Sequence, residues 1–249
     1  MNNRVALLFW GLTRGLKYTQ SSIVNNVIMP LRRNGYEVDV FIHTYYFEGT
    51  YSNSRHGIEN MKLDFTEYRL LNPKYSILED QDEIKKKLRL RRYRTKKDHF
   101  KNNYQSNDFY ILSLHSQGQV TRLFNQHKDE YRFCIFLRPD VIYVKPLNIG
   151  WLTFVGKNSM VIPGWSNYKN KKEHSENDRF CICHPDDASK YGDVLDYLLP
   201  YSKYEPIVAE FFIGFVLNKF FKVNLHRVKF IFKRVLPNGQ IMPLDGKLR

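Results

Sequence analysis

The sequence predicts an α/β fold: a mixed, mainly parallel central sheet flanked by helices, formed by one domain that spans residues 1–249. Short apolar runs typical of buried strands alternate with segments of helical periodicity, which is the order that a parallel sheet with crossover helices requires. The chain is also long enough, and at 43% hydrophobic and 15% aromatic residues apolar enough, to bury one sizeable core.

The N-terminal part carries the clearest strand–helix–strand pattern. Residues 4–10, RVALLFW, form a continuous apolar run that predicts a buried strand, followed by the polar loop GLTRGLKYT. Residues 21–31 carry apolar side chains at helical spacing, and Asn34-Gly35 supplies a stop signal. Residues 38–42 then predict a second short buried strand, which makes this unit the start of a parallel sheet.

Residues 47–105 interrupt the pattern and are expected to be a variable insertion. Residues 45–80 are polar and weakly periodic, so we assign them to irregular structure. The run from Lys85 to Lys97 contains nine basic residues among thirteen. Such a run indicates either a solvated face or a contact with phosphate, nucleic acid or an anionic surface, and both interpretations stay open.

Periodicity returns in the second half of the chain. A helix is predicted over residues 107–128, and it leads directly into a buried strand at residues 133–137. The later elements expected from the pattern are, in chain order, a strand in 159–165, a strand or extended segment at 179–183, a helix from Asp186-Asp187 through Leu198, an apolar helix from Pro206, and two strand-like segments in 222–239.

The charge and the cysteines limit the class of protein. A net charge of +14 favours an anionic partner, which could be nucleic acid, lipid headgroups or a phosphorylated small molecule. Three cysteines, Cys134, Cys181 and Cys183, are too few and odd in number for a disulfide scaffold. Cys181 and Cys183 with His184 resemble half a zinc site without its second half, so we expect structural thiols.

No run approaches the roughly 18 apolar residues of a membrane span, and no secretory leader precedes the first apolar run. We therefore expect a cytoplasmic protein, with a peripheral membrane contact as a further expectation from the charge.

Polar side chains follow three predicted strands. Thr13 and Arg14 follow the first strand, His43 the second, and Arg138 with Asp140 the third. Ligands of open α/β sheets bind outside the carboxyl ends of the strands, because loops and helix N-termini converge there. The sequence therefore predicts an active site at this edge of the sheet.

The run CIFLRPDVIYV is the most informative of these strand ends. Pro139 cannot continue the sheet hydrogen bonding through its own nitrogen, so Asp140 is expected at a turn after the buried strand. This carboxylate has two explanations, which the residues alone do not separate. It pairs with Arg138 or caps the next segment, or it holds a divalent cation together with phosphate oxygens.

Several segments, taken in chain order, carry a resemblance to a known family. They are VALLFWGLTRGLKYT with the helix and FIHTY strand after it, FCIFLRPDVIYV, ENDRF, and the AEFF helix before a final strand and arginine. Together they resemble soluble glycosyltransferases of the GT-A (Rossmann-like) fold, of the kind found in large algal viruses (chloroviruses) and in microbial glycan assembly. The resemblance covers most of the chain outside residues 47–105, and a viral protein would act in the host cytoplasm.

The resemblance implies a reaction and a cofactor. GT-A enzymes transfer a sugar from a nucleotide-diphosphate donor, here a UDP-sugar in the first place and a GDP-sugar in the second, to a hydroxyl of a glycan or glycoprotein acceptor. They commonly use a D-x-D motif to bind Mn²⁺ or Mg²⁺. In this chain Asp140 matches the second acidic position and Arg138 replaces the first. The resemblance thus implies a cation at Asp140, although Arg138 could itself neutralise phosphate.

The resemblance also implies site residues. Glu176-Asn177-Asp178 is similar to the acidic segment of inverting enzymes, which makes Asp178 the expected general base; the alternative is a cap paired with Arg179. Glu210 is the second catalytic candidate. A carboxylate in so apolar a helix has two explanations: a salt bridge with a buried arginine such as Arg234, or a contact to the acceptor or the sugar. The expected nucleotide-sugar contacts are Thr13, Arg14, His43, Gln117, Arg138 and Asp140.

Two rival functions follow from the same charge and phosphate chemistry. A nucleic-acid-binding protein would use the Lys85 to Lys97 cluster, and its binding would weaken steeply with salt. A nucleotidyltransferase would share the need for phosphate and metal binding. Under the glycosyltransferase hypothesis no nucleic-acid partner is expected, and the oligomeric state stays open.

Overall fold

The structure is a computed structural model that describes residues 3–165 and 175–242. Its centre is a seven-stranded sheet in which every neighbouring pair is parallel except those of the one antiparallel strand, β9. This confirms the predicted mixed, mainly parallel α/β sheet. The strands, in spatial order, are β10 (Asn224–Val228), β8 (Ser159–Pro163), β9 (Phe180–Cys183), β6 (Phe133–Leu137), β1 (Arg4–Trp10), β2 (Glu37–Tyr46) and β5 (Tyr75–Asp80).

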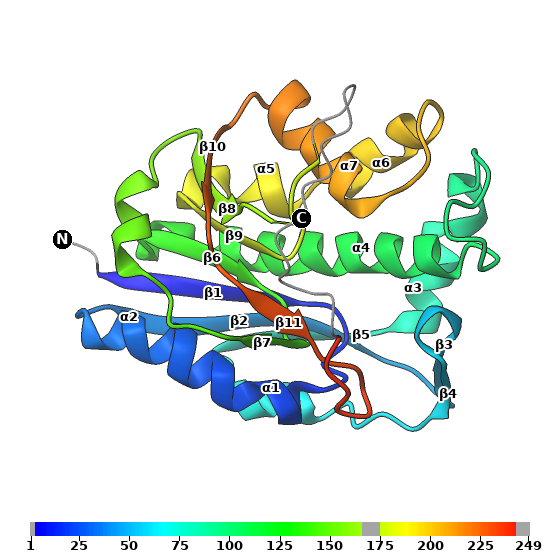
Figure 1. The fold of residues 1–249 in the computed structure, drawn as a ribbon, viewed down its shortest axis with the longest axis horizontal. Helices are drawn as coiled ribbons and strands as arrows, with labels where there is room; N and C mark the ends of the chain where they lie inside the picture. The colour runs from blue at the N-terminus through cyan, green and yellow to red at the C-terminus, as the bar shows by residue number, and fades with distance from the viewer. Residues whose placement is uncertain (1–2, 166–174, 243–249) are drawn as a thin grey trace.

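One face of the sheet is covered by the predicted first helix. It runs continuously as α1 (Leu16–Ile23), a π turn at Val24–Ile28, and α2 (Met29–Arg33), below the strands in Figure 1. Most of its apolar side chains are buried and pack against alternate side chains of β1, because both elements present one apolar face. The helix ends next to the predicted stop signal Asn34-Gly35, where Gly35 has a φ of +80° that favours glycine.

The opposite face is covered by α4 (Gln105–Asn125), α5 (Ala188–Gly192), and α7 (Ala209–Gly214) with the π turn Phe215–Phe220 that continues it (Figure 1). The remaining alternate side chains of β1 pack there against Val120 and Phe124 of α4. A further helix, α6 (Leu195–Ser202), packs against α4 in a satellite core. No helix of residues 3–165 or 175–242 has the length and apolarity to cross a bilayer.

The prediction of irregular structure for residues 45–80 is wrong in part. Residues 75–80 form β5, which pairs in parallel with β2 at the edge of the main sheet. The strand was hard to recognise because only alternate side chains are partly buried, while Ser76 and Leu78 face solvent. Before it come the short hairpin β3 (Tyr51–Asn53) and β4 (Ile58–Met61). After it Asp80 accepts hydrogen bonds from two backbone N–H groups and caps α3 (Gln81–Leu88).

The interrupted run CIFLRPDVIYV is two strands of two different sheets. Its first half is β6 of the main sheet, and its second half is β7 (Val141–Tyr143), which pairs antiparallel with β11 (Phe232–Arg234). Pro139 lies between them, and its carbonyl accepts a 2.6 Å hydrogen bond from Thr19 of α1. The break therefore redirects the chain and fixes the loop against the first helix.

The basic run from Lys85 to Lys97 covers the end of α3 and a 3₁₀ turn at Leu90–Tyr93. Several of its charges are paired within the chain: Lys85 contacts Asp82 at 2.8 Å, and Arg94 contacts Asp108 at 2.9 Å. These contacts favour the solvated-face interpretation, because exposed ion pairs of this kind are ordinary surface features.

The three cysteines are buried and free, with the Sγ atoms of Cys134 and Cys183 3.2 Å apart on neighbouring strands. This agrees with structural thiols. The Nδ1 of His184 accepts a hydrogen bond from the backbone N–H of Asp186, so this side chain caps the turn that follows it.

Replacement of Gly192 by alanine is expected to lower the free energy of unfolding by about 1–3 kcal/mol, the usual cost of overpacking. A Cβ at this position would lie 2.7 Å from the Phe136 ring and would collide with the Thr121 hydroxyl. Denaturant unfolding measures the change. Gly156→Ala is the control, because no atom lies within 4 Å of a Cβ there; equal stabilities of both variants would contradict the packing described here.

Candidate active site

A cavity of about 880 Å³ opens at the carboxyl edge of the main sheet. Five of the six parallel strands, β1, β2, β5, β6 and β8, contribute a lining residue at or just after their carboxyl ends: Gly11, Tyr45, Gln81, Arg138 and Gly164, respectively. This is the place where open α/β sheets bind ligands. The antiparallel strand β9 presents its amino end to the same cavity, which brings Asp178 and Arg179 there.

Arg138 and Asp140 form a buried bidentate pair. Arg138 Nε donates to Asp140 Oδ1 at 2.9 Å, and Nη2 donates to Oδ2 at 2.8 Å. Arg14 Nη2 approaches Oδ2 at 3.4 Å. Burial opposes ionisation of Asp140, but the charges of Arg138 and Arg14 outweigh it and hold the pKa of this carboxyl well below its usual range. The carboxylate thus orients the guanidinium groups of Arg138 and Arg14, and both residues line the cavity.

The donor set around Asp140 does not fit the Mn²⁺ or Mg²⁺ that the family resemblance implies. Asp140 is only 1% exposed and is not among the cavity-lining residues. Both of its oxygens accept from arginine, and the charge of Arg234 acts on it as well. A cation bound there would have to displace a guanidinium group and would lie in a field that is already positive.

Five arginines line the cavity: Arg14, Arg55, Arg138, Arg179 and Arg234. They come from the loop after β1, the 3₁₀ turn after β3, the end of β6, the start of β9 and the end of β11. Aromatic rings contact four of them. Arg14 lies 5.0 Å from the Tyr51 ring centre and Arg138 lies 5.9 Å from that of Trp10, and the other two lie over Phe100 and Trp165. Guanidinium groups in fixed orientations are the side chains best suited to bind phosphate oxygens in pairs.

Asp178 and Glu210 supply carboxylates to the same cavity, one on each side of Arg179. Arg179 Nη2 lies 3.1 Å from Glu210 Oε1, and Arg179 Nε lies 3.6 Å from Asp178 Oδ1. The buried Asp178 Oδ1 accepts no hydrogen bond from the residues that the structure describes. Burial, and the nearby charge of Asp178, raise the pKa of Glu210.

Two predicted contact residues lie away from the cavity. Thr13 is buried, and its carbonyl accepts the N–H groups of Gly15 and Leu16 at 2.8 and 3.0 Å, so its role is to form the turn into α1. Gln117 is buried in α4, where its carbonyl accepts from the Thr121 hydroxyl. Neither lines the cavity.

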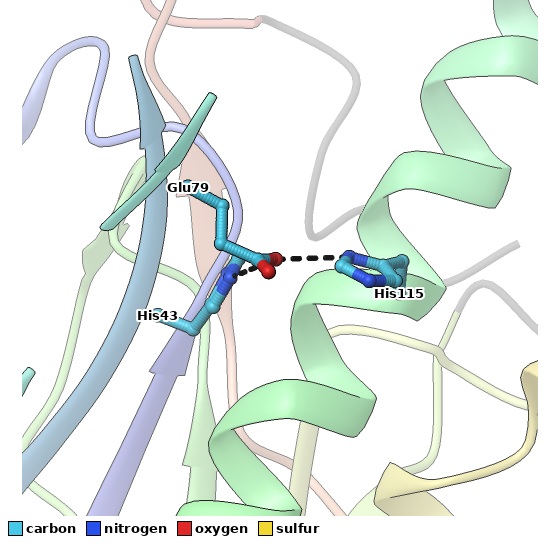
Figure 2. A group of neighbouring side chains, drawn as sticks. All are labelled: His43, Glu79 and His115. Carbon is cyan, nitrogen blue, oxygen red and sulfur yellow. Dashed lines mark hydrogen bonds and ion pairs between the residues drawn. The ribbon is translucent and has the colours of Figure 1, made fainter. Parts of the chain in front are cut away.

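His43 is fully buried and lies beside the cavity rather than in it. It belongs to a group with Glu79 and His115, and dashed lines in Figure 2 join Glu79 to both imidazoles. Burial lowers the pKa of His43 and that of His115, the latter to about 4. The hydrogen bond from His43 lowers the pKa of Glu79, so at pH 7 two neutral imidazoles face one carboxylate.

The sequence interpretation missed most of the cavity wall. The segment set aside as variable contributes polar and aromatic side chains, and α4 contributes a row near its amino end. The polar and charged residues of that segment show no helical or strand periodicity from which its position in the fold could have been predicted. The missed lining residues with side chains of chemical interest are Asn53, Arg55, His56, His99, Phe100, Tyr110, Ser113, Trp165 and Arg179.

The chain was compared with family models, with curated proteins and with solved structures. No family model matches it, and no curated protein does. Among solved structures it is similar to the apo form of mouse xyloside xylosyltransferase 1. That similarity has 13% sequence identity and a TM-score of 0.46, and it covers 91% of this chain and 85% of that one.

Proposed function

We propose that this protein is a GT-A glycosyltransferase that moves a sugar from a nucleotide-diphosphate donor to a hydroxyl group of a glycan. The observation that carries the proposal is the cavity at the carboxyl edge of the sheet, which combines five arginines with two carboxylates. The basic side chains suit a diphosphate, and the carboxylates suit proton removal from an acceptor hydroxyl. A UDP-sugar is the donor we favour, with a GDP-sugar second.

The arginines would hold the diphosphate and stabilise it as a leaving group. When the bond between the anomeric carbon and the diphosphate oxygen breaks, its electron pair passes to that oxygen. Fixed positive groups next to this oxygen stabilise the charge without reorganising during the reaction. The Asp140 carboxylate keeps Arg138 and Arg14 in place for this task.

Asp178 is the proposed general base. Its carboxyl group lines the cavity and its side chain is 17% exposed, so it can meet an acceptor hydroxyl and accept its proton. The acceptor oxygen then attacks the anomeric carbon on the face away from the diphosphate, which gives inversion in one displacement. Glu210 is placed to hold Arg179, the residue between the two carboxylates.

Glu210→Gln is expected to leave stability at pH 7 unchanged or slightly raised. The pKa of Glu210 is raised in the folded protein, so protonation of this group favours the folded state. This contribution to the free energy of unfolding is fully present below the unfolded pKa of about 4.3 and is lost as pH rises through the folded pKa. Unfolding of wild type and variant between pH 4 and 7.5 measures this difference. A variant much less stable than wild type at pH 7 would show that the ionised form is stabilising.

Product analysis tests the proposed function. The protein is incubated with a panel of UDP- and GDP-sugars, with and without glycan acceptors, and released nucleotide is separated by chromatography. We expect release of the nucleoside diphosphate from one donor. In a parallel incubation with nucleoside triphosphates and sugar 1-phosphates, release of pyrophosphate would instead indicate a nucleotidyltransferase, and no turnover in either incubation would count against both.

A further inference from the structure

Three side chains that can ligate a metal meet at a place outside the cavity (Figure 2). His43 comes from β2, Glu79 from the neighbouring strand β5, and His115 from α4. In the parallel register Tyr45 is opposite Glu79, which puts the side chains of His43 and Glu79 on the sheet face that α4 covers. The fold itself therefore brings the three residues together.

We propose that His43, Glu79 and His115 form a binding site for a divalent transition-metal ion, with Zn²⁺ as the best-suited ion. Nε2 of His43 lies 2.9 Å and Nδ1 of His115 lies 3.5 Å from the same oxygen, Oε2 of Glu79. The three ligand atoms all lie within 4.8 Å of one another. Tetrahedral Zn²⁺ with bonds of about 2.0–2.2 Å separates its ligand atoms by about 3.3–3.5 Å. Small side-chain rotations bring the group to that geometry.

The donor set selects the class of metal. Two imidazole nitrogens and one carboxylate oxygen suit Zn²⁺ and its first-row neighbours, whereas Mg²⁺ and Ca²⁺ prefer oxygen ligands alone. The side chain of Glu79 is 24% exposed, so solvent can reach the group and complete the coordination. The positive charges of Lys87 and Arg122 act on His115 and oppose a cation, which limits the affinity.

Ser116 can form a hydrogen bond with Nδ1 of His43 whether Nε2 carries a proton or a metal ion. Its hydroxyl lies 2.7 Å from Nδ1 of His43 and 3.2 Å from the carbonyl oxygen of the same residue. Without metal, Ser116 can donate to Nδ1 while Nε2–H donates to Glu79. When a metal binds Nε2, the ring proton moves to Nδ1, so that Nδ1–H can donate to Ser116 and the hydroxyl hydrogen can turn to the carbonyl. Metal-bound histidines commonly have such a partner on the second ring nitrogen.

His115 has an equivalent arrangement. Its Nδ1 lies 2.9 Å from the hydroxyl oxygen of Tyr45, and its Nε2 lies 3.2 Å from the side-chain amide of Gln119. If the amide turns to present its oxygen, Nε2–H donates to Gln119 and Nδ1 is left with a lone pair for the metal. Both imidazoles thus have a hydrogen-bond partner in either state.

A bound ion would connect the edge strand β5 to β2 and α4. Gln81, directly after β5, lines the cavity, and so do Tyr45 and Leu112 next to the site. The expected consequence is stabilisation of the fold by metal binding to the native state, in proportion to the logarithm of the free metal concentration.

Metal titration of the full chain tests the site. The protein is freed of metal with EDTA, exchanged into buffer without chelator, and titrated with Zn²⁺ against a competing chromophoric chelator. We expect one equivalent to bind and the melting temperature to rise with Zn²⁺ but not with Mg²⁺. Co²⁺ in place of Zn²⁺ should give the visible absorption of a tetrahedral site.

Glu79→Gln and His115→Gln are expected to weaken Zn²⁺ binding at least about 100-fold, since each removes a direct ligand and loss of an outer partner alone costs about 10–100-fold. His127→Gln is the matched control, because His127 Nδ1 also contacts a glutamate, Glu130, at 3.2 Å but belongs to no three-ligand group among residues 3–165 and 175–242. Circular dichroism of the metal-free variants shows that they fold. Absence of stoichiometric binding, or equal binding in all variants, would overturn the proposal.

Discussion

Asp178→Asn is expected to lower kcat for sugar transfer by about 10²–10⁴-fold, the usual contribution of a general base. The amide keeps the size of the carboxylate but cannot accept the acceptor proton. Binding of the nucleoside diphosphate should change little, because Asp178 is not one of the basic groups that would hold it. Transfer rates at saturating donor and acceptor, together with isothermal titration of the nucleotide, measure the two effects.

Asp129→Asn is the control for this substitution, since Asp129 is exposed and distant from the cavity lining. It should transfer sugar at the wild-type rate. If Asp178→Asn retained wild-type kcat, Asp178 would have no part in proton transfer, and the alternative role as an ion-pair partner of Arg179 would remain.

Arg138→Met is expected to lower the free energy of unfolding by about 3–5 kcal/mol, because it leaves a buried carboxylate without its main partner. It should also weaken binding of the nucleoside diphosphate. Denaturant unfolding and titration calorimetry measure the two losses. The stability loss should shrink as the pH falls below about 3.9, since the pKa of Asp140 is lowered in the folded protein and its stabilising contribution disappears on protonation.

A double variant separates stability from binding. Arg138→Met combined with Asp140→Leu replaces the buried ion pair by apolar groups, which is often neutral for stability. We expect its stability to return towards that of wild type while nucleotide binding stays weak. If nucleotide binding also returned, Arg138 would have only a structural role.

The fold was predictable where burial imposes a regular pattern. β1, the helix after it and β6 are buried on defined faces, so their apolar spacing identified them. β5 was missed because an edge strand buries few side chains. The two halves of CIFLRPDVIYV could not be assigned to separate sheets from the sequence, because the pairing of β7 with β11 joins segments some ninety residues apart.

The candidate site was predictable only in part. Arg14, Arg138, Asp178 and Glu210 line the cavity, as expected from their positions next to strand ends or in an apolar helix. Gln117 does not, because it lies one helical turn beyond Ser113, the last lining residue of α4. The position of a residue at a strand end does not tell whether its side chain enters the cavity or turns into the core.

We propose that fixed guanidinium groups bind the donor diphosphate where the family resemblance implies a cation. Calorimetric titration of wild-type protein with UDP and GDP, in buffer that contains EDTA, tests it most directly. We expect saturable binding of one nucleoside diphosphate in EDTA, and weaker binding to the Arg138→Met/Asp140→Leu double variant. Absence of binding to either nucleotide, or binding that begins only when Mn²⁺ is supplied, would contradict it.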